Sequence, residues 1–221
     1  MKIKKLYVYG DSFVHGDGLD QNFVWPNLLA TKLGANVENR GAAGGSNKLS
    51  LHRLFRDLAD LKKFSKSTLI IFAWTSIHRS CYWDTIDNEW YNFLVNFRNK
   101  NHIKKITEEV YYNYIHTDFD AVQTQIIQAI TVQSFLALND IKYFFINSFR
   151  DEEDGSRLMF DELKPMEQLI LKDKYLLGYE NSIRKEVCIK KALLGKDKFH
   201  PCTQGHNLAS DLILQDLKSK L

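Results

Sequence analysis

The sequence predicts an α/β protein whose strands form a parallel sheet. Apolar runs at residues 6–9, 68–74 and 141–147 have the length and composition of strands that are buried inside a sheet, and residues 35–39 carry a weaker strand signal. Stretches with a helical spacing of apolar residues separate these runs. Alternation of strands and helices is typical of a parallel sheet with right-handed crossovers, and 221 residues are enough to bury one sizeable core.

Residues that favour the ends of elements mark the first strand and the first helix. The apolar run at residues 6–9 stops at Gly10. In residues 23–34, Pro26 suits the first turn of a helix and Gly34 suits its end. We therefore expect a strand, a loop and a helix in this order.

Three further helices are predicted along the chain. Residues 49–63 place apolar side chains on one helical stripe, namely Leu51, Leu54, Phe55, Leu58 and Leu61. Residues 118–138 predict a long helix that ends at an Asn-Asp turn. Residues 205–221 predict a closing amphipathic helix whose inward side chains are Leu208, Leu212, Ile213 and Leu217.

Two regions do not fit this alternation. Residues 80–116 are rich in aromatic side chains, and we expect them to form an irregular helical insertion. Residues 150–195 are highly charged, and we expect a helix near 183–194 and a lid over the site. Because no linker rich in proline, glycine or serine divides the chain, one domain spanning residues 1–221 is expected.

Composition excludes several classes of partner. The net charge is only +3, and the lysines near the C-terminus are expected to form a solvated face, so no nucleic-acid partner is predicted. No segment approaches the roughly 20 apolar residues of a membrane span, and the apolar run at the N-terminus is too short for a signal peptide. Cys81, Cys188 and Cys202 fit reduced thiols in a cytoplasmic protein. The oligomeric state is left open.

Three loops follow predicted strands, and each contains small polar residues. They are Gly10–Ser12, Asn39–Asn47 and Trp74–Arg79. Functional groups of parallel α/β sheets gather beyond the carboxyl ends of the strands. We therefore expect the three loops to converge in space.

A serine, a histidine and a carboxylate are available for nucleophilic catalysis. A serine nucleophile needs a base beside it, and the base needs an orienting group. Ser12 ends the first loop, and the sequence DKFHP places Asp197 three residues before His200. This spacing lets the carboxylate hold one imidazole nitrogen while the other faces the site. The spacing alone is frequent by chance in surface turns, but Pro201 stiffens this loop.

Three blocks taken together resemble those of the SGNH/GDSL hydrolases: YGDSF near the start, NRGAAGGSN after the second strand and DKFHP before the last helix. The resemblance implies a three-layer α/β/α sandwich with a central parallel sheet, the flavodoxin-like fold of these hydrolases. It implies that Ser12 is the nucleophile, His200 the general base and acid, and Asp197 the orienting carboxylate. The implied activity is hydrolysis of a small acyl ester without a cofactor.

The resemblance also implies an oxyanion hole. In the family this hole combines the backbone N–H of the serine, the N–H of a glycine and an asparagine side chain, and the first two correspond here to Ser12 and Gly44. A glycine suits its position because no Cβ hinders the approach of the substrate. The third block departs from the family pattern, because Ser76 stands at the asparagine position. Ser76, Thr75 and Asn47 are the candidates for the third donor.

The substrate is inferred from residues beside the third block. Trp74, His78 and Arg79 are expected to contact it, although a role in the loop is an equal alternative for His78 and Arg79 and a place in the core is the alternative for Trp74. Aromatic rings of the insertion could stack on sugars, so an O-acetyl group on a carbohydrate is the expected ester. No carboxylate–histidine cluster has the spacing of metal ligands, so no metal is expected. Acyl transfer to an alcohol and a catalytically idle module that binds a glycan or a partner protein are the alternatives.

Overall fold

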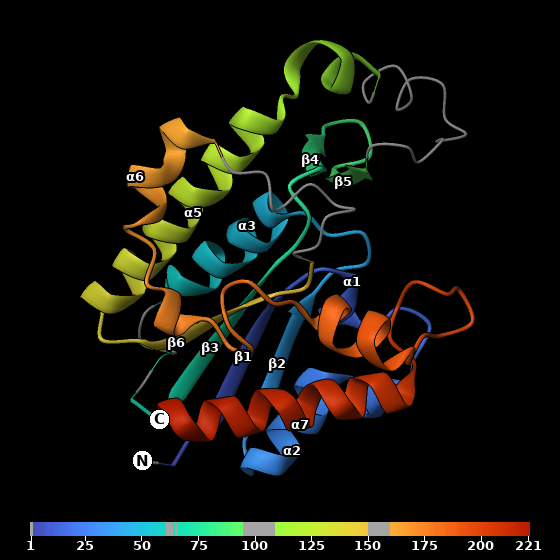
Figure 1. Cartoon of the computed structure of the whole chain (residues 1–221), viewed down its shortest axis with the longest axis vertical. Helices are drawn as coiled ribbons and strands as arrows, with labels where there is room; N and C mark the ends of the chain where they lie inside the picture. The colour runs from blue at the N-terminus through green and yellow to red at the C-terminus, as the bar shows by residue number, and fades with distance from the viewer. Residues whose placement is uncertain (1, 61–63, 65, 95–108, 150–159) are drawn as a thin grey trace.

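A four-stranded parallel sheet forms the centre of the molecule (Figure 1). The computed structural model describes residues 2–60, 64, 66–94, 109–149 and 160–221. In the order β2-β1-β3-β6, the strands are Asn36–Gly41, Lys5–Gly10, Thr68–Trp74 and Lys142–Asn147. The four segments that were predicted as strands are therefore the four strands of the sheet.

The register of the strands brings their carboxyl ends to one edge. β1 pairs with β2 from Lys5 opposite Asn36 to Gly10 opposite Gly41. β1 also pairs with β3, and β3 pairs with β6 up to Trp74 opposite Asn147. The loops that follow β1, β2 and β3 consequently start side by side.

Helices cover both faces of the sheet. The four long helices are α2 (Trp25–Leu33), α3 (Asn47–Leu58), α5 (Asp118–Leu138) and α7 (Thr203–Lys220). In Figure 1, α2 and α7 lie on one side of the sheet, and α3 and α5 lie on the other. Val8 and Ile71 belong to the core cluster that includes residues of α2 and α7, whereas Tyr9 and Phe72 belong to the cluster that includes residues of α3 and α5. The architecture is the predicted three-layer α/β/α sandwich.

The burial of the apolar side chains of α3 and α7 that were predicted to face the core is confirmed in part. Leu54 and Leu58 of α3 are buried, whereas Leu51 and Phe55 pack at the margin of the core, and Leu61 lies outside the described residues. In α7, Ile213 and Leu217 are buried, and Leu208 and Leu212 are only partly buried. Across the described ranges, no helix combines the length and apolar character needed to cross a bilayer.

Polar contacts fix the last helix against the first long one. The backbone N–H of Trp25 donates to Nδ1 of His206 at 3.2 Å. Lys32 donates through Nζ to Ser210 Oγ at 2.6 Å and pairs with Asp211 at 2.7 Å. Burial lowers the pKa of His206 to about 4, so this imidazole is neutral where it accepts the Trp25 hydrogen bond.

The aromatic insertion contains a β-hairpin where a helical segment was expected. β4 (Arg79–Asp84) pairs antiparallel with β5 (Glu89–Leu94), and Trp83 lies opposite Trp90. Aromatic residues favour strands when a turn separates two such runs, and the intervening turn contains Asn88 at φ 53°. A π-helical turn, η3 (Tyr111–Ile115), precedes α5, and the part of the insertion at 95–108 lies outside the described residues.

The charged region before the last helix consists of short elements. They are η4 (Asp161–Leu163), α6 (Lys164–Glu167), η5 (Lys172–Lys174) and the π-helical η6 (Arg184–Ile189), the last of which lies within the predicted helix. Tyr175 forms a parallel bridge with Phe145, so a single residue occupies the position of a fifth strand beside β6. Residues 150–159 of the expected lid lie outside the described residues.

Candidate active site

Ser12 lies in a sharp turn at the end of β1. The side chain of Asp11 accepts the backbone N–H of Phe13 at 3.0 Å and thereby caps α1 (Ser12–His15). Gly41 of β2 lies against this turn, because a Cβ there would come within 2.4 Å of the backbone nitrogen of His15. A glycine at this position therefore allows the serine turn to approach β2 closely.

A continuous series of hydrogen bonds joins Ser12 to His200 and Asp197. His200 Nε2 lies 2.9 Å from Ser12 Oγ, and His200 Nδ1 lies 2.5 Å from Asp197 Oδ2. An ionised carboxylate only accepts hydrogen bonds, so the proton of a neutral imidazole resides on Nδ1. Nε2 is then the acceptor for the hydroxyl of Ser12.

Asp197 is ionised at neutral pH. Burial raises the pKa of Asp197, but hydrogen bonds from the His200 ring and from the backbone N–H groups of Phe199 and His200 outweigh burial and hold the pKa at about 2. Both backbone bonds measure 3.0 Å. The loop is closed by a 2.7 Å bond from the N–H of Gly195 to the carbonyl of His200. Asp197 therefore orients the ring of His200, and the backbone bond of Gly195 closes the loop that carries both residues.

A pocket of about 510 Å³ opens beside the imidazole. Its lining includes Asp17, Leu194, Asp197, His200 and Thr203. Asp17 Oδ2 lies 4.0 Å from Nε2 of His200, so a second carboxylate faces a positive charge that develops on this ring. Residues that follow α1 and residues that precede α7 thus line one pocket.

Gly44 and Ser76 can still donate hydrogen bonds. Gly44 is exposed at φ 62°, where a Cβ would meet nothing within 4 Å, and its N–H has no acceptor within the described ranges. Ser76 is buried, and its Oγ accepts the N–H of His78 at 3.3 Å, whereas its own hydroxyl proton has no acceptor among the residues that the structure describes. Both residues are in the loops that were expected to converge.

The structure does not favour Asn47 or Thr75 as the third oxyanion donor. Asn47 Oδ1 accepts the N–H of Thr75 at 2.8 Å, and Asn47 Nδ2 donates to the carbonyl of Thr75 at 3.2 Å. The hydroxyl of Thr75 donates to Asp11 at 2.6 Å. Asn47 therefore holds the loop after β3 in place, and Ser76 is the remaining side-chain candidate.

Asp11 joins three loops at the carboxyl edge of the sheet, a role that the sequence did not reveal. Besides capping α1, it accepts the hydroxyl of Thr75 after β3 and the hydroxyl of Ser148 after β6, the latter at 3.0 Å. Its Oδ2 lies 3.6 Å from Nη1 of Arg79. Both side chains are buried, 0% exposed for Asp11 and 6% for Arg79. In the sequence, the signal for this role was the position of Asp11 directly before the candidate nucleophile Ser12.

The structure does not favour Trp74 or Arg79 as substrate contacts, because both side chains are buried. Trp74 is 1% exposed and packs between Phe72 and Phe145, because it is the last residue of a fully buried strand. Arg79 is directed to Asp11, and its guanidinium lies 5.0 Å from the ring centre of Phe149. Both side chains support the site from within the core.

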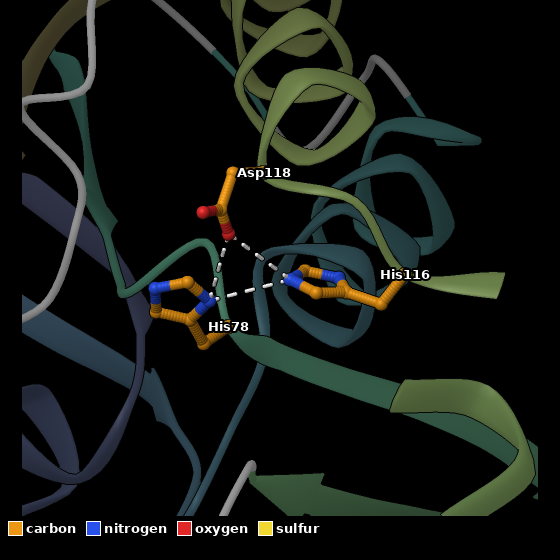
Figure 2. Close-up of side chains that lie close together, drawn as sticks. All are labelled: His78, His116 and Asp118. Atoms are coloured by element: carbon orange, nitrogen blue, oxygen red, sulfur yellow. Dashed lines mark hydrogen bonds and ion pairs between the residues drawn. The ribbon is translucent and has the colours of Figure 1, made fainter. Parts of the chain in front are cut away.

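His78 lies in a separate cluster with His116 and Asp118 (Figure 2). The three side chains come from the loop after β3, the residue after η3 and the first turn of α5. Among the described residues, this is the group of histidine, cysteine and carboxylate side chains whose ligand atoms lie close enough to hold a metal ion. No spacing in the sequence indicated it, because 38 residues separate the two histidines.

Solved structures share this fold at low sequence identity. A lipolytic protein of the G-D-S-L family from Desulfitobacterium hafniense DCB-2 is 14% identical, with a TM-score of 0.58 over 96% of this chain and 99% of that chain. The psychrotrophic esterase EstA from Pseudoalteromonas sp. is 12% identical, with a TM-score of 0.58 over 98% and 97%. A lipase/acylhydrolase from Enterococcus faecalis is 16% identical, with a TM-score of 0.53 over 99% and 97%. The chain therefore has the α/β fold of GDSL/SGNH hydrolases.

Sequence comparison identifies the family. No curated protein matches the chain. A family model described as "Family of unknown function (DUF6071)" matches residues 16–213, a range that includes Asp197 and His200 and begins after Ser12. The chain belongs to this family, DUF6071, and has the fold of the GDSL/SGNH hydrolases.

Proposed function

We propose that the protein is a serine hydrolase of the SGNH type that cleaves small acyl esters through Ser12, His200 and Asp197. The observation that carries this proposal is the series of hydrogen bonds from Asp197 through His200 to Ser12. Solved proteins of the same fold that are described as esterases support the same class of reaction.

The first half of the reaction forms an acyl-enzyme. His200 Nε2 takes the proton of Ser12 Oγ as this oxygen attacks the carbonyl carbon of the ester, and the carbonyl electron pair moves onto oxygen. The ionised Asp197 holds Nδ1–H and stabilises the imidazolium that forms. Asp17, 4.0 Å from Nε2, adds a second negative charge on the opposite side. His200 then gives its proton to the departing alcohol oxygen.

The tetrahedral oxyanion needs hydrogen-bond donors. The N–H of Ser12 is the first in α1 and has no acceptor within the helix. Together with the N–H of Gly44 and the hydroxyl of Ser76, it provides three donors from the loops after β1, β2 and β3. Water then attacks the acyl-enzyme with His200 again as the base, which releases the acid and restores Ser12.

The substrate class follows from the pocket and the hairpin. A pocket of about 510 Å³ beside His200 is large enough for a short acyl group or a small alcohol. On the hairpin, Trp83 is 45% exposed and can stack on a sugar ring. We expect O-acetyl groups on a carbohydrate to be cleaved faster than long-chain esters.

A fluorophosphonate probe tests the nucleophile directly. The wild type is expected to be labelled at Ser12, and Ser12→Ala is expected to lose labelling and at least about 10⁴-fold in turnover of a short-chain ester. Ser219→Ala is the matched control, because this exposed serine lies at the end of α7 and is expected to keep full labelling.

Two outcomes would separate the alternatives. A folded wild type that is neither labelled nor active would overturn the proposal and favour an idle binding module. Labelled enzyme that transfers its acyl group to added sugar faster than to water would identify acyl transfer instead of hydrolysis. Mass spectrometry of the products, with and without sugar, measures this ratio.

A further inference from the structure

Three potential ligand atoms converge on one point outside the Ser12–His200 site. His78 Nδ1 and His116 Nε2 lie 3.3 Å apart, and Asp118 Oδ1 lies 3.8 Å from the first and 3.7 Å from the second. Figure 2 shows that both ring nitrogens and the carboxylate oxygen point toward one another. The three residues come from separate segments, so the tertiary fold creates this convergence.

Hydrogen bonds account for only one side of this triangle. The 3.3 Å separation fits a hydrogen bond between the two rings, but 3.7 and 3.8 Å are too long for one. A single proton between the rings leaves the carboxylate oxygen without a donor inside the cluster. Three atoms that carry lone pairs therefore face a common point.

The size of the triangle fits a zinc-sized ion. A circle through three atoms separated by 3.3, 3.7 and 3.8 Å has a radius of about 2.1 Å. Zinc binds imidazole nitrogen at about 2.0–2.1 Å and carboxylate oxygen at about 2.0–2.2 Å. An ion near the centre of the triangle would meet all three distances without movement of the backbone.

The surroundings orient both histidines. The N–H of His78 donates to Ser76, and the carbonyl of His78 accepts the hydroxyl of Tyr112. The backbone N–H of His116 donates to the carbonyl of Tyr111 at 2.7 Å, and the rings of both tyrosines pack against the His116 ring.

We propose that His78, His116 and Asp118 bind one divalent transition-metal ion of the Zn²⁺ type. Two imidazoles with one carboxylate suit Zn²⁺, whereas Mg²⁺ and Ca²⁺ prefer ligand sets made of oxygen atoms. The side chain of Asp118 is 49% exposed, so solvent can reach a fourth coordination position. The ion ties the loop after β3 to the start of α5. This proposal does not depend on ester hydrolysis.

Zinc titration of the metal-free full chain, followed by calorimetry with the cysteines kept reduced, tests the site. The wild type is expected to bind one equivalent with a Kd of about 1 µM or tighter. Loss of an outer-shell partner costs 10- to 100-fold in metal affinity, so His116→Ala is expected to weaken binding by about 100-fold or more. X-ray absorption of the zinc complex is expected to show two imidazole nitrogens and oxygen at about 2.0–2.1 Å.

Three further variants make the test decisive. Asp118→Asn changes an exposed side chain without threatening the fold and is expected to weaken binding at least about tenfold. His52→Ala, an exposed histidine elsewhere, and His200→Ala are expected to keep one equivalent. Unchanged affinity in both His116→Ala and Asp118→Asn would overturn the proposal, as would loss of zinc in His200→Ala or displacement of zinc by millimolar Mg²⁺. Absence of binding by the folded wild type would overturn it as well.

Discussion

Replacement of Asp11 by asparagine tests how the carboxyl edge of the sheet is held together. The amide keeps one oxygen for the N–H of Phe13 and the hydroxyl of Ser148. It removes the negative charge that lies 3.6 Å from Nη1 of Arg79. This nitrogen is buried and has no hydrogen-bond partner within the described ranges, so its charge depends on the carboxylate.

The expected loss of stability follows from this distance. Two unit charges 3.6 Å apart attract each other by about 5 kcal/mol at an effective dielectric constant of 20. Removal of one partner from a buried pair usually costs about 3–5 kcal/mol, because the other charge stays buried and uncompensated. We therefore expect Asp11→Asn to lower the free energy of unfolding by about 4 kcal/mol and to reduce ester turnover, because Arg79 and the loop after β3 lose the carboxylate oxygen that they share.

Urea denaturation of a double-mutant cycle measures this effect. For a slope near 2.5 kcal/mol/M, the midpoint is expected to fall by about 1.6 M with the slope unchanged. Arg79→Met removes the charge and keeps an apolar stem over Phe149, so the double variant is expected to lose at least about 1 kcal/mol less than the sum of the single variants. A loss below about 1 kcal/mol for Asp11→Asn, or strict additivity, would refute the reasoning.

Three other predictions concern single positions. The pKa of His206 is about 4 in the folded protein and about 6.5 in the unfolded chain, so the unfolded chain binds the proton more readily. The free energy of unfolding should therefore fall by about 2 kcal/mol from pH 7 to pH 5. Urea titrations measure this fall, and a His206→Gln variant that keeps the same dependence on pH would contradict the prediction. Ser76→Ala should lower kcat about 100-fold with little change in KM, and unchanged kcat would exclude it as an oxyanion donor. Gly41→Ala should cost about 1–3 kcal/mol in denaturant titrations, because its Cβ meets the backbone of His15, and a neutral effect would show that the turn can shift.

The sheet and its main helices could be predicted because their signals are local. β1, β3 and β6 are short apolar runs, and α5 and α7 carry regular apolar spacing with clear ends. The two-sided burial of the strands then requires helices on both faces. The hairpin of β4 and β5 was not predicted, because its aromatic residues also suit a helical segment packed on the core. The pairing that places Trp83 opposite Trp90 identifies the segment as a hairpin, and this pairing is visible only in the structure.

The candidate site could be predicted where a compact motif carries it. Asp197 and His200 are three residues apart, and the structure places His200 within hydrogen-bond distance of both Asp197 and Ser12. Their catalytic roles stay a prediction until the labelling experiment is done. The engagement of Asn47 with Thr75 could not be predicted, because it depends on how two distant loops meet.

The packing of α7 against α2 has a consequence for the newly made chain. Ser12 is synthesised with the first strand, but the imidazole that would activate it follows 188 residues later, immediately before the final helix. Until that helix docks on α2 through contacts such as Lys32 with Asp211, the hydroxyl has no base. A chain that ends before His200 is therefore expected to stay unlabelled by the fluorophosphonate probe, although it contains Ser12.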